Sequence, residues 1–223
     1  MHANIQTMQS YTSIMGETTL ARPTRQAILD ATDRLLGRLG YHKTTIDDLA
    51  REAGIARRTI YLHFPSKEEI FLASIDRVVE RLLEELRAIA RTEDPPEARL
   101  RRMLLTRVLF RFDSVRDYHE SLEDLLSVLR PAYLRRRERY FQGEAEILAG
   151  VIAEGRRQGA LDAKDPLEAA RALVTATNSL LPASLSTPEL GSREAIEAEI
   201  TRVTDLLLRG LLSRSPLAAR TMT

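Results

Sequence analysis

The sequence predicts an all-α protein, on two observations. Apolar residues recur at three- and four-residue spacing in nearly every segment of the 223-residue chain, which is the period of a helix with one buried face. No segment alternates apolar and polar residues as a half-buried strand does, and no repeat or low-complexity tract is visible. A chain of this length can bury a substantial core, in one large domain or two small ones.

Four helices are expected in the N-terminal third of the chain. The first ends at Gly40, since glycine adopts the left-handed conformation of a helix cap, and it carries an apolar stripe: Ile28, Ala31, Leu35 and Leu39. Thr45 is a favourable N-cap for a short second helix, and Asp47 and Asp48 follow in its first turn, where the helix dipole favours negative charge. A third helix is expected from about Ala56 to His63.

The rest of the chain is expected to form longer helices. Pro65 stops the third helix, and Ser66 caps a long fourth helix, with Glu69 in the position of a capping box. After the break at EDPPEA, further helices are expected at about 96–112, 115–129, 131–158, 165–181 and 193–212. Pro131 is expected to open the third of these, and PASLSTPELGS is expected to be a long loop.

The composition excludes several classes of chemistry. The chain has no cysteine, which excludes disulfides, thiolate catalysis and thiolate metal sites. Residues 1–21 lack the features of a secretory signal and are expected to be a disordered polar leader, and residues 215–223 a flexible tail. No apolar run approaches the roughly 20 residues that span a membrane. The protein is therefore expected to be cytoplasmic, without a membrane partner.

Charge is distributed unevenly along the chain. The formal net charge is +1, but residues 22–67 hold nine basic and five acidic residues. This segment therefore carries an excess of four positive charges, and the rest of the chain carries a deficit of three. A basic unit joined to a mildly acidic one favours nucleic-acid binding at the N-terminal end.

The second and third helices have the dimensions of a helix-turn-helix. Ala50 is small where the two helices would cross, and Gly54 suits a turn that needs a positive φ. Leu49, Ile55 and Ile60 would supply the buried faces that fix the crossing angle. A helical hairpin with glycine in its turn is common, so this pattern alone also fits a hairpin that binds no DNA.

The surrounding residues are more specific. The stretch TTIDDLAREAGIARRTIYLHFPSKEEIF resembles the DNA-binding domain of the TetR family of transcriptional repressors. The resemblance covers about residues 25–75, with the long first helix, the paired threonines and the T-x-Y-x-x-F-x-x-K run. It implies a homodimer with a three-helix DNA-binding domain over 22–68 and a larger helical domain over 69–214 for effector binding and dimerisation. Arg58 stands where the family often has glycine, so no operator sequence is carried over.

The third helix would enter the major groove of a double-stranded DNA operator. Arg57 and Arg58 lie in its N-terminal half, and arginine can pair bidentately with guanine, which discriminates by about 1–3 kcal/mol. Thr59 is close enough to contact a thymine methyl group or a phosphate.

Four other residues are expected to contact phosphates, which position the protein and carry no sequence information. Tyr61, His63 and Lys67 lie on or just after the third helix. Thr45 directly precedes the second helix and is expected on the far side of the helix-turn-helix. Each has a structural alternative: Thr45 as a helix cap, Tyr61 and His63 as packed side chains, and Lys67 as a solvated charge.

A pocket for a small-molecule effector is expected among the central helices. They hold most of the few aromatic residues, and a pocket built from these would be apolar, with tyrosine hydroxyls to orient the ligand. Asn178 is a polar exception on an apolar helix face and could reach the same cavity or the dimer partner. The other candidates, each of which could equally be ordinary core, are Met103, Phe110, Phe112, Tyr118, Tyr133, Tyr140 and Phe141.

The last two long helices are expected to form the homodimer. Their wide apolar faces lie next to small residues, and two helices from each subunit would make a four-helix bundle. Leu206 and Leu207 are the expected anchors of the interface, and the alternative is a core within one chain.

No enzyme, cofactor or metal is predicted. The four histidines have no metal-ligand spacing, and neither a nucleophile–base pair nor a glycine-rich phosphate loop is visible. The basic run LRRRERY reads as a solvated helix face. Two functions therefore compete: a regulator, most often a repressor, that an apolar or amphipathic effector releases from its operator, and an architectural DNA-binding protein without an effector.

Overall fold

The computed structural model describes the backbone of residues 4–116, 122–185, 189 and 191–212, with side chains from residue 23 onward except those of 122 and 123. In this part of the chain the regular structure is helical, apart from one antiparallel bridge between Leu161 and Leu212. The all-α prediction is therefore confirmed. The chain divides into two compact units, one ending at Asp76 and one beginning at Arg77.

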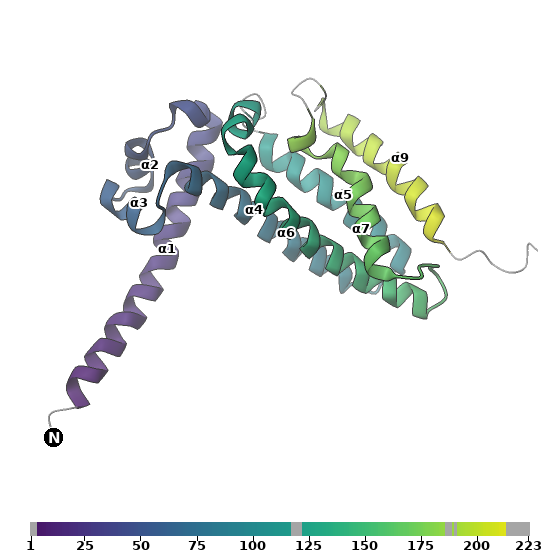
Figure 1. Ribbon diagram of the computed structural model, residues 1–223, viewed down its shortest axis with the longest axis horizontal. Coiled ribbons are helices and arrows are strands. Elements are labelled where there is room, and N and C mark those ends of the chain that lie inside the picture. The colour runs from purple at the N-terminus through teal and green to yellow at the C-terminus, as the bar shows by residue number, and fades with distance from the viewer. Residues whose placement is uncertain (1–3, 117–121, 186–188, 190, 213–223) are drawn as a thin grey trace, which may run out of the picture. The chain divides into compact units, whose positions relative to one another are not determined.

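The N-terminal unit begins with a longer helix than the sequence suggested. Helix α1 spans Asn4–Lys43 (Figure 1), so residues 4–21, expected to be disordered, are helical. Pro23 lies inside α1, where its missing amide proton removes one hydrogen bond without ending the helix. Residues 1–3 and the expected tail at 215–223 lie outside the described residues. Gly40 breaks the helical geometry at φ 73° and ψ 174°, which confirms that the regular helix ends there.

Two short helices follow and pack on α1. Helix α2 spans Ile46–Ala53, and α3 spans Arg57–His63. The predicted cap and turn are both present: Thr45 and Asp48 form a capping box, and Gly54 ends α2 at φ 67°. Helix α4, Lys67–Ala90, then starts in this unit. These helices share an apolar core: Ile28, Leu29, Ala31, Leu35, Leu49, Ala50, Ile60, Phe64, Ile70 and Ala73.

The C-terminal unit contains the longer helices α5, Pro96–Val115, and α6, Leu122–Arg157. The expected helix boundary at Pro131 is wrong, because this proline lies inside α6. Leu129 before it and Tyr140 after it are both buried. Continued burial on the two sides of the proline offsets the hydrogen bond that its ring removes.

Two further helices complete the C-terminal unit. Helix α7 spans Pro166–Thr177 and α9 spans Arg193–Leu211, with short 3-10 turns at Asn178–Leu180 and Pro182–Ser184. Helix α7 packs beside α6 and α9 beside α5, as Figure 1 shows. The main core joins these helices: Leu82, Leu86, Leu100, Met103, Leu104, Leu148, Val151, Ile152, Leu161, Leu173, Val174 and Leu208.

One close contact in this core gives a stability prediction. A Cβ atom at Gly155 of α6 would lie 2.6 Å from Leu161 Cδ1 and 2.9 Å from Pro96 Cβ. Gly155→Ala should therefore lower the free energy of unfolding by about 1–3 kcal/mol through overpacking. Gly150→Ala is the matched control in the same helix, because no heavy atom lies within 4 Å of its Cβ, and it should raise the free energy of unfolding by up to about 1 kcal/mol. Urea unfolding followed by circular dichroism measures both, and equal effects of the two substitutions would contradict the packing.

Candidate functional site

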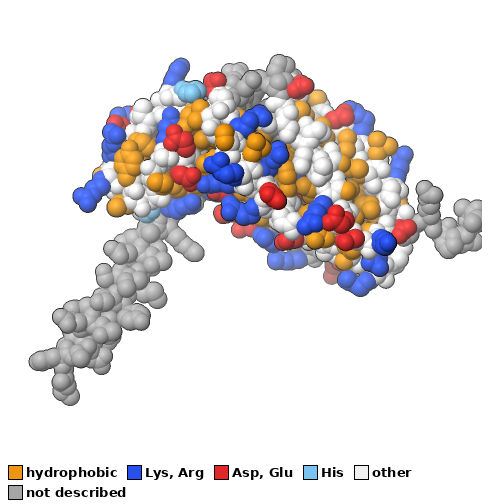
Figure 2. Space-filling model, in the orientation of Figure 1, with side chains coloured by type: hydrophobic (Ala, Val, Ile, Leu, Met, Phe, Trp, Pro, Cys, Tyr) orange, Lys and Arg blue, Asp and Glu red, His pale blue; other side chains and the backbone are white. Residues whose placement is uncertain are grey.

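Helix α3 is held by one face and leaves the other face open. Ile60 is fully buried, and Phe64, which follows the helix, is 4% exposed. On the opposite side Tyr61 is 46% exposed and Leu62 is 75% exposed. Arg58 lies four residues before Leu62 and is also exposed, so the two share a face. Figure 2 shows lysine, arginine and hydrophobic side chains intermixed around α2 and α3.

Arg57 is tied to α2. Its Nη1 donates to both carboxylate oxygens of Asp47, at 3.1 and 3.0 Å, and its guanidinium lies 5.9 Å from the centre of the Tyr61 ring. Both partners of the ion pair are more than half exposed, so the pair adds little to stability. It does give Arg57 a defined position beside the open face of α3.

Thr45 serves as a helix cap. Its Oγ1 accepts from the Asp48 amide at 3.1 Å, and its own amide donates to Asp48 Oδ2, also at 3.1 Å. The bonds from Thr45 hold the pKa of Asp48 below its ordinary value. The capping alternative for Thr45 is therefore correct, and a phosphate contact by the same hydroxyl stays a prediction.

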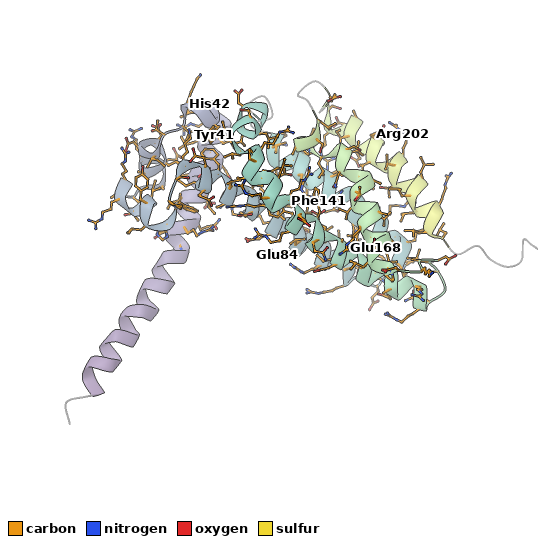
Figure 3. All side chains as sticks on the ribbon, in the orientation of Figure 1. Tyr41, His42, Glu84, Phe141, Glu168 and Arg202 are labelled. Atoms are coloured by element: carbon orange, nitrogen blue, oxygen red, sulfur yellow. The ribbon has the colours of Figure 1, made fainter. Side chains whose placement is uncertain are left out.

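Lys67 lies against aromatic rings. Its ammonium is 4.2 Å from the centre of the Tyr41 ring and 6.0 Å from that of Phe71, a cation–π arrangement. Burial lowers the pKa of Lys67. The Tyr41 hydroxyl donates to Glu68 Oε1 at 3.3 Å, and Tyr41 is labelled near the end of α1 in Figure 3. The ammonium of Lys67 is therefore held in one place by the aromatic rings. It is not the freely solvated charge that the sequence allowed as an alternative.

The remaining candidates of the N-terminal unit are less constrained. Thr59 and His63 are half-buried, and the exposure of Tyr61 rules out a core role for that residue. Two arginines of this unit share one of its carboxylates, since Glu52 accepts from Arg34 at 2.7 Å and from Arg38 at 3.2 Å.

The C-terminal unit contains a buried charged cluster that the sequence reasoning missed. Arg107 Nε donates to Glu144 Oε2 at 2.7 Å, and Arg111 Nη2 donates to Glu144 Oε1. Arg107 also donates to the Thr177 hydroxyl and to Asn178 Oδ1, the latter at 2.9 Å. A signal was present in the sequence: Arg107 and Arg111 lie four residues apart on the apolar stripe of α5, where a solvated arginine would not be expected.

This cluster changes the composition expected for the effector pocket. Met103, Phe112 and Tyr140 are buried in the core, whereas Phe110, Tyr133 and Phe141 are half-buried. Tyr118 lies outside the described residues. The region is therefore charged at its centre, and not lined only by apolar side chains and tyrosine hydroxyls.

Two grooves open on the C-terminal unit. One, of about 690 Å³, runs along α5 past Leu105 and Phe110. The other, of about 730 Å³, lies between α6 and α7 and is bounded by Phe141 and Val174. Phe141, labelled in Figure 3, therefore lies at the edge of a groove and beside the charged cluster.

The two expected interface residues behave differently. Leu206 of α9 is 69% exposed, and it lies one helical turn from Arg202, which Figure 3 labels on the same helix. Leu207 packs against the main core of its own chain. Leu207 is therefore partly buried within its own chain, Leu206 is the more exposed of the two, and an interface role for either stays a prediction.

Neither a cluster suited to a metal ion nor a helix suited to a membrane occurs among the residues that the structure describes. None of these residues forms a group of three or more histidine, aspartate or glutamate side chains arranged to hold a metal ion. Within the same residues, no helix is both long and apolar enough to cross a membrane.

A helix-turn-helix unit with an open second helix, followed by a separate helical unit, defines a class of DNA-binding transcription regulators. Residues 28–74 match the family model described as bacterial regulatory proteins, tetR family, and residues 96–204 match that of a tetracyclin repressor-like C-terminal domain. The two models together span more than half of the chain. The chain belongs to the TetR family of transcriptional regulators, as its N-terminal motif predicted.

Individual relatives match to different extents. The fatty acid metabolism regulator protein of Bacillus subtilis is 26% identical over 160 residues, 70% of this chain and 80% of that protein. The HTH-type transcriptional regulator EthR of Mycolicibacterium smegmatis is 46% identical over 55 residues, only 25% of each chain. The crystal structure of a TetR transcription regulator from Haloarcula marismortui has a TM-score of 0.67 and 23% identity, over 85% of this chain and 98% of that one, and this likeness shows the fold alone.

The surroundings of Tyr41 give a pH prediction. Burial, together with the neighbouring Glu68, raises the pKa of Tyr41 from 10.0 to about 12. Because the folded state favours the neutral phenol, the resulting stability is fully present below about pH 10 and is lost as the pH rises towards 12. A tyrosinate absorbance titration should show a late component whose amplitude falls by one tyrosine in Tyr41→Phe. Burial also raises the pKa of Tyr133, so the measurement is made in a Tyr133→Phe background. A late component that Tyr41→Phe leaves undiminished there would contradict the assignment.

Proposed function

We propose that this TetR-family protein is a ligand-responsive repressor that binds a double-stranded operator through α3. The observation that carries the proposal is the open face of α3, which presents Arg58 and Leu62 while Ile60 holds the helix to the unit's core. A helix fixed by one face and exposed by the other can enter a major groove without rearrangement.

In this proposal the arginines of α3 read bases and the flanking residues hold phosphates. Arg57 and Arg58 would each pair with guanine, and Thr59 would contact a thymine methyl group or a phosphate. The phosphate contacts would come from the other candidates: Thr45, Tyr61, His63 and Lys67. The placement of the Lys67 ammonium on the Tyr41 ring supports a phosphate contact, since it limits the positions the cation can take.

Leu62 joins the base-reading residues. Its side chain is an apolar group on an otherwise polar open face, and it lies next to Arg58. The thymine methyl is the apolar feature of a major-groove edge. Leu62 would therefore contact a thymine adjacent to the guanine that Arg58 reads.

Operator binding is proposed to require a homodimer formed by α7 and α9. Leu206 is exposed on α9, and Ala172 and Ala176 on α7 and Ala198 on α9 are small exposed residues that permit close helix packing. Light scattering that showed a stable monomer at micromolar concentration would contradict the dimer.

An amphipathic effector is proposed to release the operator. Helix α4 is continuous across the division between the two units, since it starts at Lys67 and ends at Ala90. A ligand that tilts this helix would change the spacing of the two recognition helices in the dimer, which fixed half-sites do not tolerate. The relative named as a fatty acid metabolism regulator supports an effector that carries a hydrocarbon chain. The alternative, an architectural protein, predicts that no ligand alters operator affinity.

The division of roles is tested with two substitutions and an operator selected from random DNA. Lys67→Ala should weaken binding to all sequences and reduce the salt slope by about one unit, because one phosphate contact is lost. Arg58→Ala should instead relax specificity at one base pair, at a cost of about 1–3 kcal/mol for the preferred base. Fluorescence anisotropy over a salt series measures both. If the two variants weakened every sequence equally, the assignment of roles would be wrong.

The Leu62 contact is tested by removing only the methyl group. Replacing the contacted thymine by uracil should weaken binding of the wild-type protein about fourfold per half-site, the value of one buried methyl group. Leu62→Ala should bind thymine and uracil operators equally, whereas Arg58→Ala should keep the difference between them. A wild-type protein that is indifferent to uracil at every position of the operator would refute this contact while leaving operator binding intact.

A further inference from the structure

Two arginines share one carboxylate inside the C-terminal unit. The side chains of Arg107 and Glu144 are fully buried, and that of Arg111 is nine-tenths buried. Glu144 uses one oxygen for each arginine. Although burial opposes ionisation of the carboxyl, Arg111 and Arg107 hold the pKa of Glu144 below its ordinary value. The carboxylate is therefore ionised.

The charges of this cluster do not balance. Two guanidinium groups face one carboxylate, and among the described residues no second carboxylate pairs with either arginine. Among these residues one positive charge is left over, on a side chain that is nine-tenths buried. Buried charges are ordinarily paired, because an unpaired one costs several kcal/mol of solvation.

A purely structural role does not explain the second arginine. Arg107 alone would satisfy Glu144 while also donating to Thr177 and Asn178. Among the described residues, Arg111 donates to Glu144 and to the backbone oxygen of Arg107. A guanidinium has five N–H groups, so Arg111 retains three donors that the described residues do not use. The extra cation and its free donors suit an anion that comes from outside the chain.

A groove lies beside this cluster, and Phe141 belongs to both. The Phe141 ring lies 5.7 Å from the guanidinium carbon of Arg107 and 5.6 Å from that of Arg137. Arg137, which is exposed, and Phe141 both line the groove of about 730 Å³ between α6 and α7. Its wall is mixed, with an apolar part formed by Leu134, Phe141, Ala145 and Val174 and a polar part formed by Arg137, Glu138, Gln142, Arg171 and Thr175. A ligand in this groove would have its apolar part on the wall and its anionic end at the arginines.

We propose that Arg111 and Arg137 bind the carboxylate of an amphipathic acid that is the effector of this protein. The apolar chain of the acid lies in the groove beside Phe141. The planar guanidinium matches the geometry of a carboxylate, and the added negative charge neutralises the cluster. This inference rests on the proposed ligand-responsive function and specifies the chemistry of the ligand.

The first test needs no ligand, because the proposal predicts the sign of a stability change. Arg111→Met removes the surplus charge and leaves the neutral pair of Arg107 and Glu144, so the melting temperature of the free protein should stay level or rise by about 2–4 °C. Arg107→Met is the matched control in the same helix. It leaves Thr177 and Asn178 without their donor and should lower the melting temperature.

The second test compares probes that differ only in their head group. Octanoate, decanoate and dodecanoate are each compared with the alcohol of the same length, by thermal shift and by operator anisotropy. At least one acid should raise the wild-type melting temperature and weaken operator binding about tenfold or more, and its alcohol should do neither. In Arg111→Met the acid should lose both effects while operator binding without ligand is unchanged.

The outcomes separate this inference from the proposed function. Acids and alcohols that act equally would overturn the carboxylate site while preserving a ligand-responsive regulator. The same conclusion follows if Arg111→Met lowers the melting temperature as much as Arg107→Met does, or if it keeps the response to the acid. A protein that binds its operator but responds to none of the acids would also overturn the site. A protein that selects no operator would instead overturn the proposed function.

Discussion

The anchoring of α3 through one side determines the functional geometry of the N-terminal unit. Ile60 and Phe64 enter a core shared with α1, α2 and α4, and a seven-residue helix would have no stable structure without that burial. The same contacts decide which residues remain outside. Because side chains four residues apart lie on one helix face, the burial of Ile60 is what leaves Arg58 and Leu62 together on the opposite side.

The C-terminal unit is organised differently, because its core contains charge. Helix α5 carries Arg107 and Arg111 on the face that also buries Met103 and Leu104, and Glu144 of α6 meets both arginines. Apolar packing alone would tolerate several relative positions of two helices, whereas a bridging carboxylate permits few. The cluster therefore fixes how α5 and α6 meet, and it does so at the point where a bound anion would change the local charge.

The success of the sequence reasoning depended on how local each feature is. The Thr45 cap, the turn at Gly54 and the break in α1 at Gly40 were predicted, because each is set by residues within one helical turn. The continuous α6 was missed, since burial on both sides of Pro131 outweighs the local helix-breaking signal. Glu144 was missed for a related reason: its partners lie more than thirty residues away in the sequence, and no spacing rule connects them.

The ion pair between Arg57 and Asp47 bears on how the protein would search DNA. In the free protein this guanidinium already has an acceptor from α2, so a passing phosphate would compete with a carboxylate that is permanently beside it. The edge of a guanine offers the arginine two acceptors in one plane. It can therefore displace that carboxylate more effectively than a single phosphate oxygen can. Asp47 would thus weaken contacts with arbitrary DNA more than contacts with the correct site, which shortens the time spent on wrong sequences and favours rapid sliding.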